Sequence, residues 1–73
     1  MPQLSIVIPC HNEEACLAEL HRRVSAAAMA VVGDDHEIIL VDDGSRDRTW
    51  PLIRELAAAD PHLLGIHLSR NHG

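Results

Sequence analysis

The sequence lacks lysine, phenylalanine and tyrosine, and Trp50 is its only tryptophan. With 6 basic residues against 11 acidic ones and a net charge of −5 at pH 7, it has no broad basic surface for nucleic acid. It also lacks any apolar run near the ~20 residues that span a bilayer, and any basic-then-apolar signal peptide. We therefore expect a cytoplasmic protein without a nucleic-acid partner.

Cysteine is scarce as well, which excludes a disulfide framework. Cys10 and Cys16 fit no CxxC pattern, so we expect two reduced, structural thiols. A thiol nucleophile at Cys10 beside His11 is the disfavoured alternative, because no third group that would orient it is identifiable. The 6 histidines show no HxxxH spacing, so we expect no zinc site, and we expect His21 and His36 to face solvent.

The chain does contain apolar segments of two kinds, which alternate along the sequence: short β-branched runs and longer segments with helical spacing. Asn12 is placed to cap a first helix, with Glu13 and Glu14 at the positive end of its dipole. Ser45 or Asp47 can cap a second helix. β-branched runs predict strands at residues 4–9, 38–41 and 63–69, and helical spacing predicts helices from 13 to about 32 and from close to Asp47 to Asp60.

The order strand, helix, strand, helix, strand predicts an α/β fold with an open parallel sheet in strand order 3-2-1. The near-continuous apolarity of residues 4–9 is typical of a parallel strand covered on both faces. One edge of that strand is left unpaired, which predicts that the sheet continues with strands this chain does not contain. A chain of 73 residues buries only roughly 60% of its unfolded surface, so we expect it to form at most one domain or part of one.

Polar residues collect just past the predicted strands, where ligands of open parallel sheets bind. Ionised carboxylates accept hydrogen bonds and donate none, which favours a base edge or ribose hydroxyls as the ligand. Neighbouring strand residues point to opposite faces, so one of Asp42 and Asp43 enters the crevice and the other holds the loop or pairs with an arginine. A capping or Asx-turn role for the two is the alternative. The residues expected to face one another are Pro9, His11, Asn12, Glu13, Asp42 and Asp43.

No GxGxxG or Walker sequence is present to bind phosphate. Arg46, Arg48 and Arg70 lie near the same edge and can neutralise a diphosphate, although plain surface ion pairs are the commoner role for such arginines.

Three stretches in this order, SIVIPCHNEE, EIILVDDGSRDRT and HLSRNHG, resemble the N-terminal part of a family 2 glycosyltransferase over the whole chain. The likeness is closest to the polyprenol-phosphate group, which includes dolichol-phosphate mannosyltransferase and bactoprenol glucosyltransferase. It implies a GT-A type, Rossmann-like fold. It also implies transfer of a hexose from a UDP- or GDP-sugar to a polyprenol phosphate or similar lipid-phosphate acceptor, at the cytoplasmic face of the membrane.

The resemblance also implies residue roles. Pro9 and His11 line the base pocket, Glu13 contacts the nucleoside and Asp43 accepts from the base, with Asp42 as a further member of the site. The family commonly has tyrosine in place of His11.

The family binds Mg²⁺ or Mn²⁺ at a downstream DxD motif, and no DxD occurs in this sequence. We therefore expect residues 1–73 to be a partial transferase domain, truncated before that motif. It should hold no metal and no catalytic residue of its own, and it should be inactive alone. The alternative is a non-catalytic α/β module that binds a nucleotide, or that adds a strand or a second copy at the exposed edge of the first strand.

Overall fold

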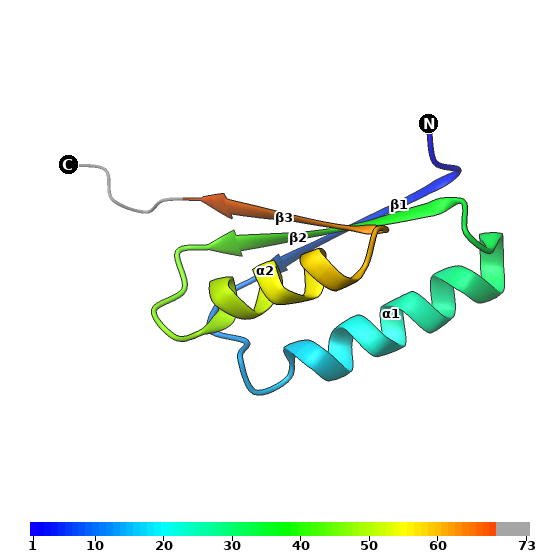
Figure 1. The fold of residues 1–73 in the computed structure, drawn as a ribbon. Coiled ribbons are helices and arrows are strands. Elements are labelled where there is room, and N and C mark those ends of the chain that lie inside the picture. The colour runs from blue at the N-terminus through cyan, green and yellow to red at the C-terminus, as the bar shows by residue number, and fades with distance from the viewer. Residues whose placement is uncertain (69–73) are drawn as a thin grey trace.

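The computed structural model describes residues 1–68, and Ser69 to Gly73 lie outside the described part. The described chain forms a parallel sheet with neighbours in the order β1-β2-β3, which is the predicted order 3-2-1. The α/β class is thereby confirmed (Figure 1). The elements are β1 (Leu4–Cys10), α1 (Leu17–Val32), β2 (His36–Asp43), α2 (Thr49–Ala59) and β3 (Leu63–Leu68).

Both helices lie on the same face of the sheet (Figure 1). The two crossovers run in the same direction, from β1 to β2 and from β2 to β3, so right-handed connections place their helices on one side. The core lies between the sheet and these helices. Its side chains with no exposed surface include Leu17 of α1, Ile38 and Leu40 of β2, and Ile53 of α2.

The other face of the sheet is open in residues 1–68, so the prediction that the first strand is covered on both faces is wrong for the described structure. Val7 of β1 is 60% exposed and Leu64 of β3 is 55% exposed. The reason is the shared direction of the two crossovers, which leaves no described helix for this face. β1 also pairs only with β2 among the described strands, as expected for an edge.

The first helix begins at Leu17, so its predicted start at residue 13 is wrong. Asn12 does not cap it, and Glu13 and Glu14 are not in its first turn. The backbone N–H groups of both glutamates donate to side chains after β2 instead, and Asn12 has a φ of 53°, which turns the chain. Asparagine tolerates this left-handed region better than most residues.

The second helix begins two residues after Asp47, close to the predicted place. Asp47 Oδ1 accepts the backbone N–H of Thr49, and Pro51 lies in the first turn, where its missing N–H costs little. Gly65 does not break β3, and it allows α2 to pack closely. A Cβ there would lie 2.6 Å from Ile53 Cγ2.

Candidate functional site

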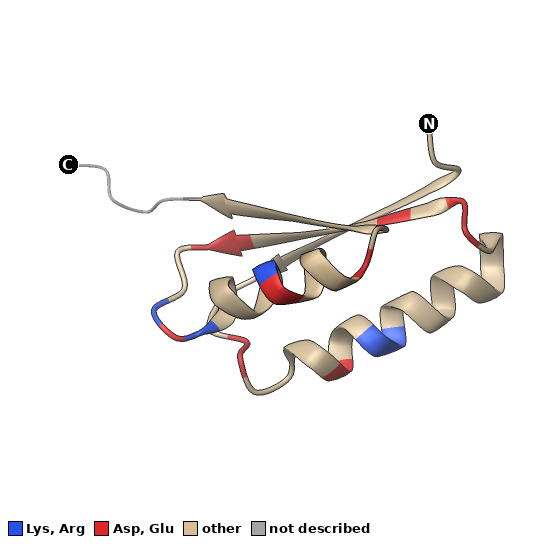
Figure 2. Ribbon diagram, viewed as in Figure 1, with Lys and Arg blue, Asp and Glu red and all other residues tan. Residues whose placement is uncertain are grey.

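The turns that follow β1 and β2 lie side by side at the carboxyl end of the sheet. The parallel register pairs Cys10 with Asp42, so the two strands end together. Figure 2 shows basic and acidic residues interspersed in the turn after β2 and acidic residues in the turn after β1. The two strand ends that the sequence predicts to face each other are therefore neighbours at one edge of the sheet.

Hydrogen bonds between backbone and side chains fasten the two turns together. The Asn12 N–H donates to Ser45 Oγ at 2.8 Å, and the Arg46 N–H donates to Asn12 Oδ1 at 2.9 Å. The Glu13 N–H donates to Thr49 Oγ1 at 2.7 Å. These bonds give the backbone N–H groups of Asn12 and Glu13 acceptors outside α1 and hold both residues in the turn that precedes the helix.

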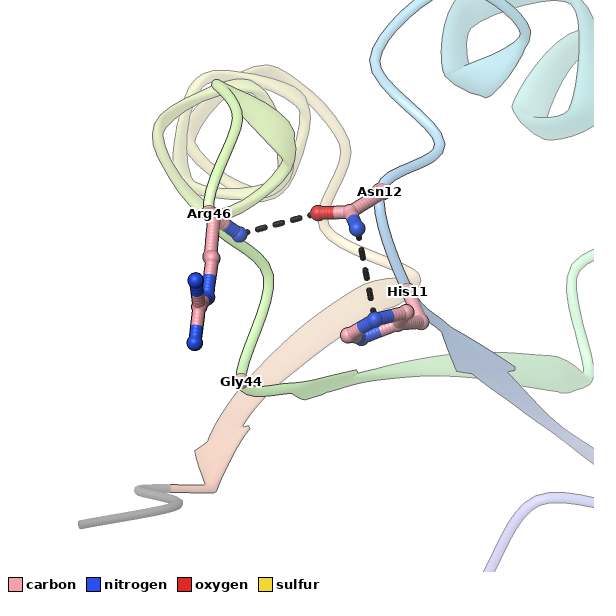
Figure 3. Close-up of a pocket in the computed structure, with 4 residues that line it drawn as sticks. All are labelled: His11, Asn12, Gly44 and Arg46. Atoms are coloured by element: carbon pink, nitrogen blue, oxygen red, sulfur yellow. Dashed lines mark hydrogen bonds between the residues drawn. The ribbon is translucent and has the colours of Figure 1, made fainter.

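A pocket of about 430 Å³ opens between the turns, lined by His11, Asn12, Gly44 and Arg46. His11 and the Arg46 side chain lie on opposite sides of it (Figure 3). Gly44 has a φ of 70°, a conformation that a residue with a side chain adopts only at a cost. The pocket is within the size range of small-molecule sites, about 300–1,000 Å³.

Two hydrogen bonds fix the His11 ring. Nδ1 lies 2.9 Å from the carbonyl oxygen of Asp43, which can only accept, so Nδ1 carries the hydrogen. Nε2 is then an acceptor for the Asn12 amide at 3.3 Å. The imidazole is held in one tautomer and one orientation beside the pocket.

Asp42 and Asp43 diverge, as their adjacency on a strand predicts. Asp42 has no exposed surface, and its Oδ1 accepts the Ser45 N–H at 3.2 Å. Asp43 is half-buried, lies at the carboxyl end of β2 and offers its carbonyl to His11. Asp42 therefore holds the loop, and Asp43 directly precedes Gly44, which lines the pocket.

Sequence reasoning did not assign a role to Thr49, which has no exposed surface. Its hydroxyl donates to Asp47 Oδ1 while accepting from Glu13. The Thr49 hydroxyl accordingly holds the pKa of Asp47 below its ordinary value. The only signal in the sequence is a hydroxyl residue that follows the DDGS turn, and it does not reveal a partner 36 positions away.

The remaining predicted site residues differ in their position relative to the pocket. Pro9 is exposed on the open face of β1, and Glu13 is half-buried in the turn. Arg46 lines the pocket, whereas Arg48 donates its backbone N–H to Glu14 Oε1 at 3.3 Å. The predicted contribution of Arg70 lies outside the described residues.

Cys10 is buried beneath the site and is expected to be unreactive. Burial, together with the negative charges of Glu13 and Asp42, raises the pKa of its thiol, so little thiolate is present near neutral pH. Cys16 is exposed. We expect iodoacetamide to label Cys16 at least about tenfold faster than Cys10 in the native chain, as measured by peptide mass spectrometry, because thiolate character and exposure control alkylation.

Labelling of the unfolded chain provides the control, in which both cysteines should react at similar rates. Equal native rates would contradict the burial of Cys10 and reopen the nucleophile alternative.

Histidines form a second cluster at the opposite end of the sheet. His36 is 4% exposed and stacks on His62 with ring centroids 4.4 Å apart, so the expectation that His36 faces solvent is wrong. His21, also expected to face solvent, is half-buried and pairs with Asp60 at 2.7 Å. Residues 1–68 contain no group of three or more metal-ligating side chains that could hold an ion.

A family model described as glycosyl transferase family 2 matches residues 5–73. The chain belongs to this family. The resemblance identified in its three motifs is thereby confirmed, and together with the three-stranded parallel sheet the match supports the N-terminal, Rossmann-like half of a GT-A type fold.

Several curated proteins are similar to this glycosyl transferase family 2 chain along nearly its whole length. It is 53% identical over 72 residues to the undecaprenyl-phosphate 4-deoxy-4-formamido-L-arabinose transferase of Shewanella sediminis, covering 96% of this chain and 21% of that protein. Proteins of the same name from Enterobacter sp. (strain 638) and Pseudomonas aeruginosa (strain LESB58) are 44% and 48% identical. These two matches cover 97% and 96% of this chain and 22% and 21% of the two relatives, respectively. The expected likeness to polyprenol-phosphate transferases is confirmed, and the chain spans about a fifth of these relatives.

Proposed function

We propose that the pocket between the two turns binds the nucleotide of a nucleotide-sugar donor. We further propose that the larger protein containing this pocket transfers the sugar to a polyprenol phosphate. The observation that carries the proposal is the meeting of His11, Gly44 and Arg46 around one pocket at the carboxyl ends of neighbouring parallel strands.

Each pocket residue has a chemical role in this proposal. The oriented imidazole of His11 offers a flat surface for a base, and the Asp43 carboxylate accepts hydrogen bonds from base N–H groups. Arg46 supplies positive charge and paired donors for a diphosphate. Gly44 leaves room for the nucleotide to approach the backbone. Pro9 and Glu13 belong to the same proposal as neighbours of the base and the nucleoside, and Asp42 belongs to it as the support of the turn.

The acceptor and the sugar are argued from the relatives. Undecaprenyl phosphate, a polyprenol phosphate, appears in their names and supports a lipid-phosphate acceptor. Transfer at the cytoplasmic face of a membrane is part of the proposal. The names also specify a pentose derivative, so that class has to be tested beside the hexose that the sequence led us to expect. Neither described helix is long and apolar enough to cross a bilayer.

A divalent metal does not fit the described residues, which offer no suitable ligand group. We propose that residues 1–73 are the donor-binding part of a larger transferase domain and transfer no sugar alone. Support comes from the share of each relative that the chain spans and from the absence of a DxD motif.

Replacing Asp43 tests the proposed pocket. We expect Asp43→Ala to weaken UDP or GDP binding about tenfold or more, because a hydrogen bond to a charged acceptor contributes about 1.5–3 kcal/mol. Isothermal titration calorimetry of the wild-type and variant chains measures the two dissociation constants. The matched control is Asp35→Ala, which removes an exposed carboxylate before β2 at the other end of the sheet.

Equal affinities of wild type and Asp43→Ala would remove Asp43 from the site. Failure of the wild-type chain to bind either nucleotide would favour the alternative of an interaction module. In that alternative the β1 edge pairs with a second copy, and sedimentation at rising concentration would reveal the dimer.

A further inference from the structure

The Asp42 carboxylate has no exposed surface, and the environment of one of its two oxygens needs an explanation. Oδ1 accepts the Ser45 N–H, but Oδ2 makes no aligned hydrogen bond with any residue of the described range 1–68. Taking an ionised carboxylate out of water costs several kcal/mol unless a donor or a positive charge compensates it. The group closest to this role is His67, whose Nε2 lies 3.3 Å from Oδ2.

The position of His67 follows from the sheet and from α2. His67 is the register partner of Asp42, so both side chains lie on the helix-covered face. There the imidazole stacks on Trp50 of α2, with ring centroids 4.7 Å apart and planes 17° apart. The His67 side chain is 46% exposed, so it meets solvent on one side and the buried carboxylate on the other.

We infer that His67 is a positioning residue of the nucleotide pocket. It compensates Asp42, and Asp42 holds the turn that carries Gly44 and Arg46 through the Ser45 N–H. The link continues from Ser45 Oγ to the Asn12 backbone and so reaches the other side of the pocket. This inference rests on the proposed function, and it adds a residue of β3 to a site built from the ends of β1 and β2.

Loss of His67 leaves an anion that water does not reach. The turn can then relax by exposing Asp42, which moves Ser45 and with it the wall of the pocket. Trp50 keeps a stacking partner if phenylalanine replaces histidine, so His67→Phe removes the nitrogen that lies beside Asp42 Oδ2 while preserving an aromatic ring. Its effect on the pocket is expected to pass through Asp42 alone.

The experiment is calorimetric titration of the chain with UDP, or with GDP if the wild type binds GDP more tightly. We expect His67→Phe to raise the dissociation constant about tenfold, because a buried charged group loses its partner. His67→Gln places an amide donor near the position of Nε2 and should remain within about threefold of wild type. His67→Asn, which is too short to reach Oδ2, should show the same loss as His67→Phe.

Measurements in an Asp42→Asn background distinguish the positioning role of His67 from a general effect on stability. Asp42→Asn removes the buried charge, and in that background His67→Phe should weaken binding less than about twofold, as a coupled pair requires. His21→Phe breaks an imidazole–carboxylate pair with Asp60 at the opposite end of the sheet. This control should lower the melting temperature and leave the UDP dissociation constant within about twofold, because the pocket is remote.

The inference is overturned if His67→Phe and His67→Asn bind like the wild type, or if their loss is undiminished beside Asp42→Asn. Circular dichroism verifies that each variant is folded. If His67→Phe does not fold, the contrast between the glutamine and asparagine variants decides. Absence of nucleotide binding by the wild type would instead defeat the proposed function, and this inference with it.

Discussion

Ile53→Ala is expected to lower the free energy of unfolding by about 2–5 kcal/mol, the range for truncating a buried isoleucine. Ile53 has no exposed surface and packs from α2 against the backbone of β3 at Gly65. The truncation leaves a cavity that α2 cannot close without breaking its other contacts with the sheet. A chain of this length has little stability to spare, so a large fraction should be unfolded at 25 °C. Urea denaturation followed by circular dichroism measures the change.

Ile66→Ala is the matched control, because it removes the same atoms from the open face of the sheet. Ile66 is 38% exposed, and we expect a loss of less than about 1 kcal/mol. Equal losses for the two variants would contradict the placement of the core between the sheet and the helices.

Thr49→Val is expected to lower the free energy of unfolding by about 1–3 kcal/mol, although its shape is nearly unchanged. The variant leaves the Glu13 N–H without its acceptor and takes away a donor to Asp47. The two turns lose one of the bonds that frame the pocket, so nucleotide affinity should fall as well. Denaturation and UDP titration of the same preparation measure both effects.

Thr49→Ser keeps the hydroxyl and should recover most of both losses. A valine variant as stable as the wild type would mean that the Glu13 to Thr49 bond contributes nothing. Normal nucleotide affinity in a destabilised valine variant would separate the turn contact from the pocket.

The strands were predictable because their signal is local. Runs such as residues 38–41 are short, β-branched and bounded by polar residues, and β2 extends that run by only two residues on each side. The order of the sheet follows the tendency of consecutive strands to lie next to each other. Right-handed crossovers that run in one direction would then have indicated that both helices cover one face.

The start of α1 was not predictable, because its cause is not local. Asn12, Glu13 and Glu14 have the composition of a capped helix start, yet their backbone donors bind side chains of the turn after β2. Tertiary hydrogen bonds overrode the capping preference. The divergence of Asp42 and Asp43 was predictable from strand geometry, whereas their assignment needed the position of the helices and of His67.

The hydrogen bonds that fasten the two turns join residues 32 to 36 positions apart in the chain. During synthesis, none of them can exist before Asp43 has left the ribosome, and the bond between Glu13 and Thr49 requires the segment through Thr49. A nascent chain that has made only β1 and α1 has no pocket at all. The pocket therefore forms only after β1 and β2 have paired, so the nucleotide binding that we propose would be a property of the assembled sheet and not of either motif alone.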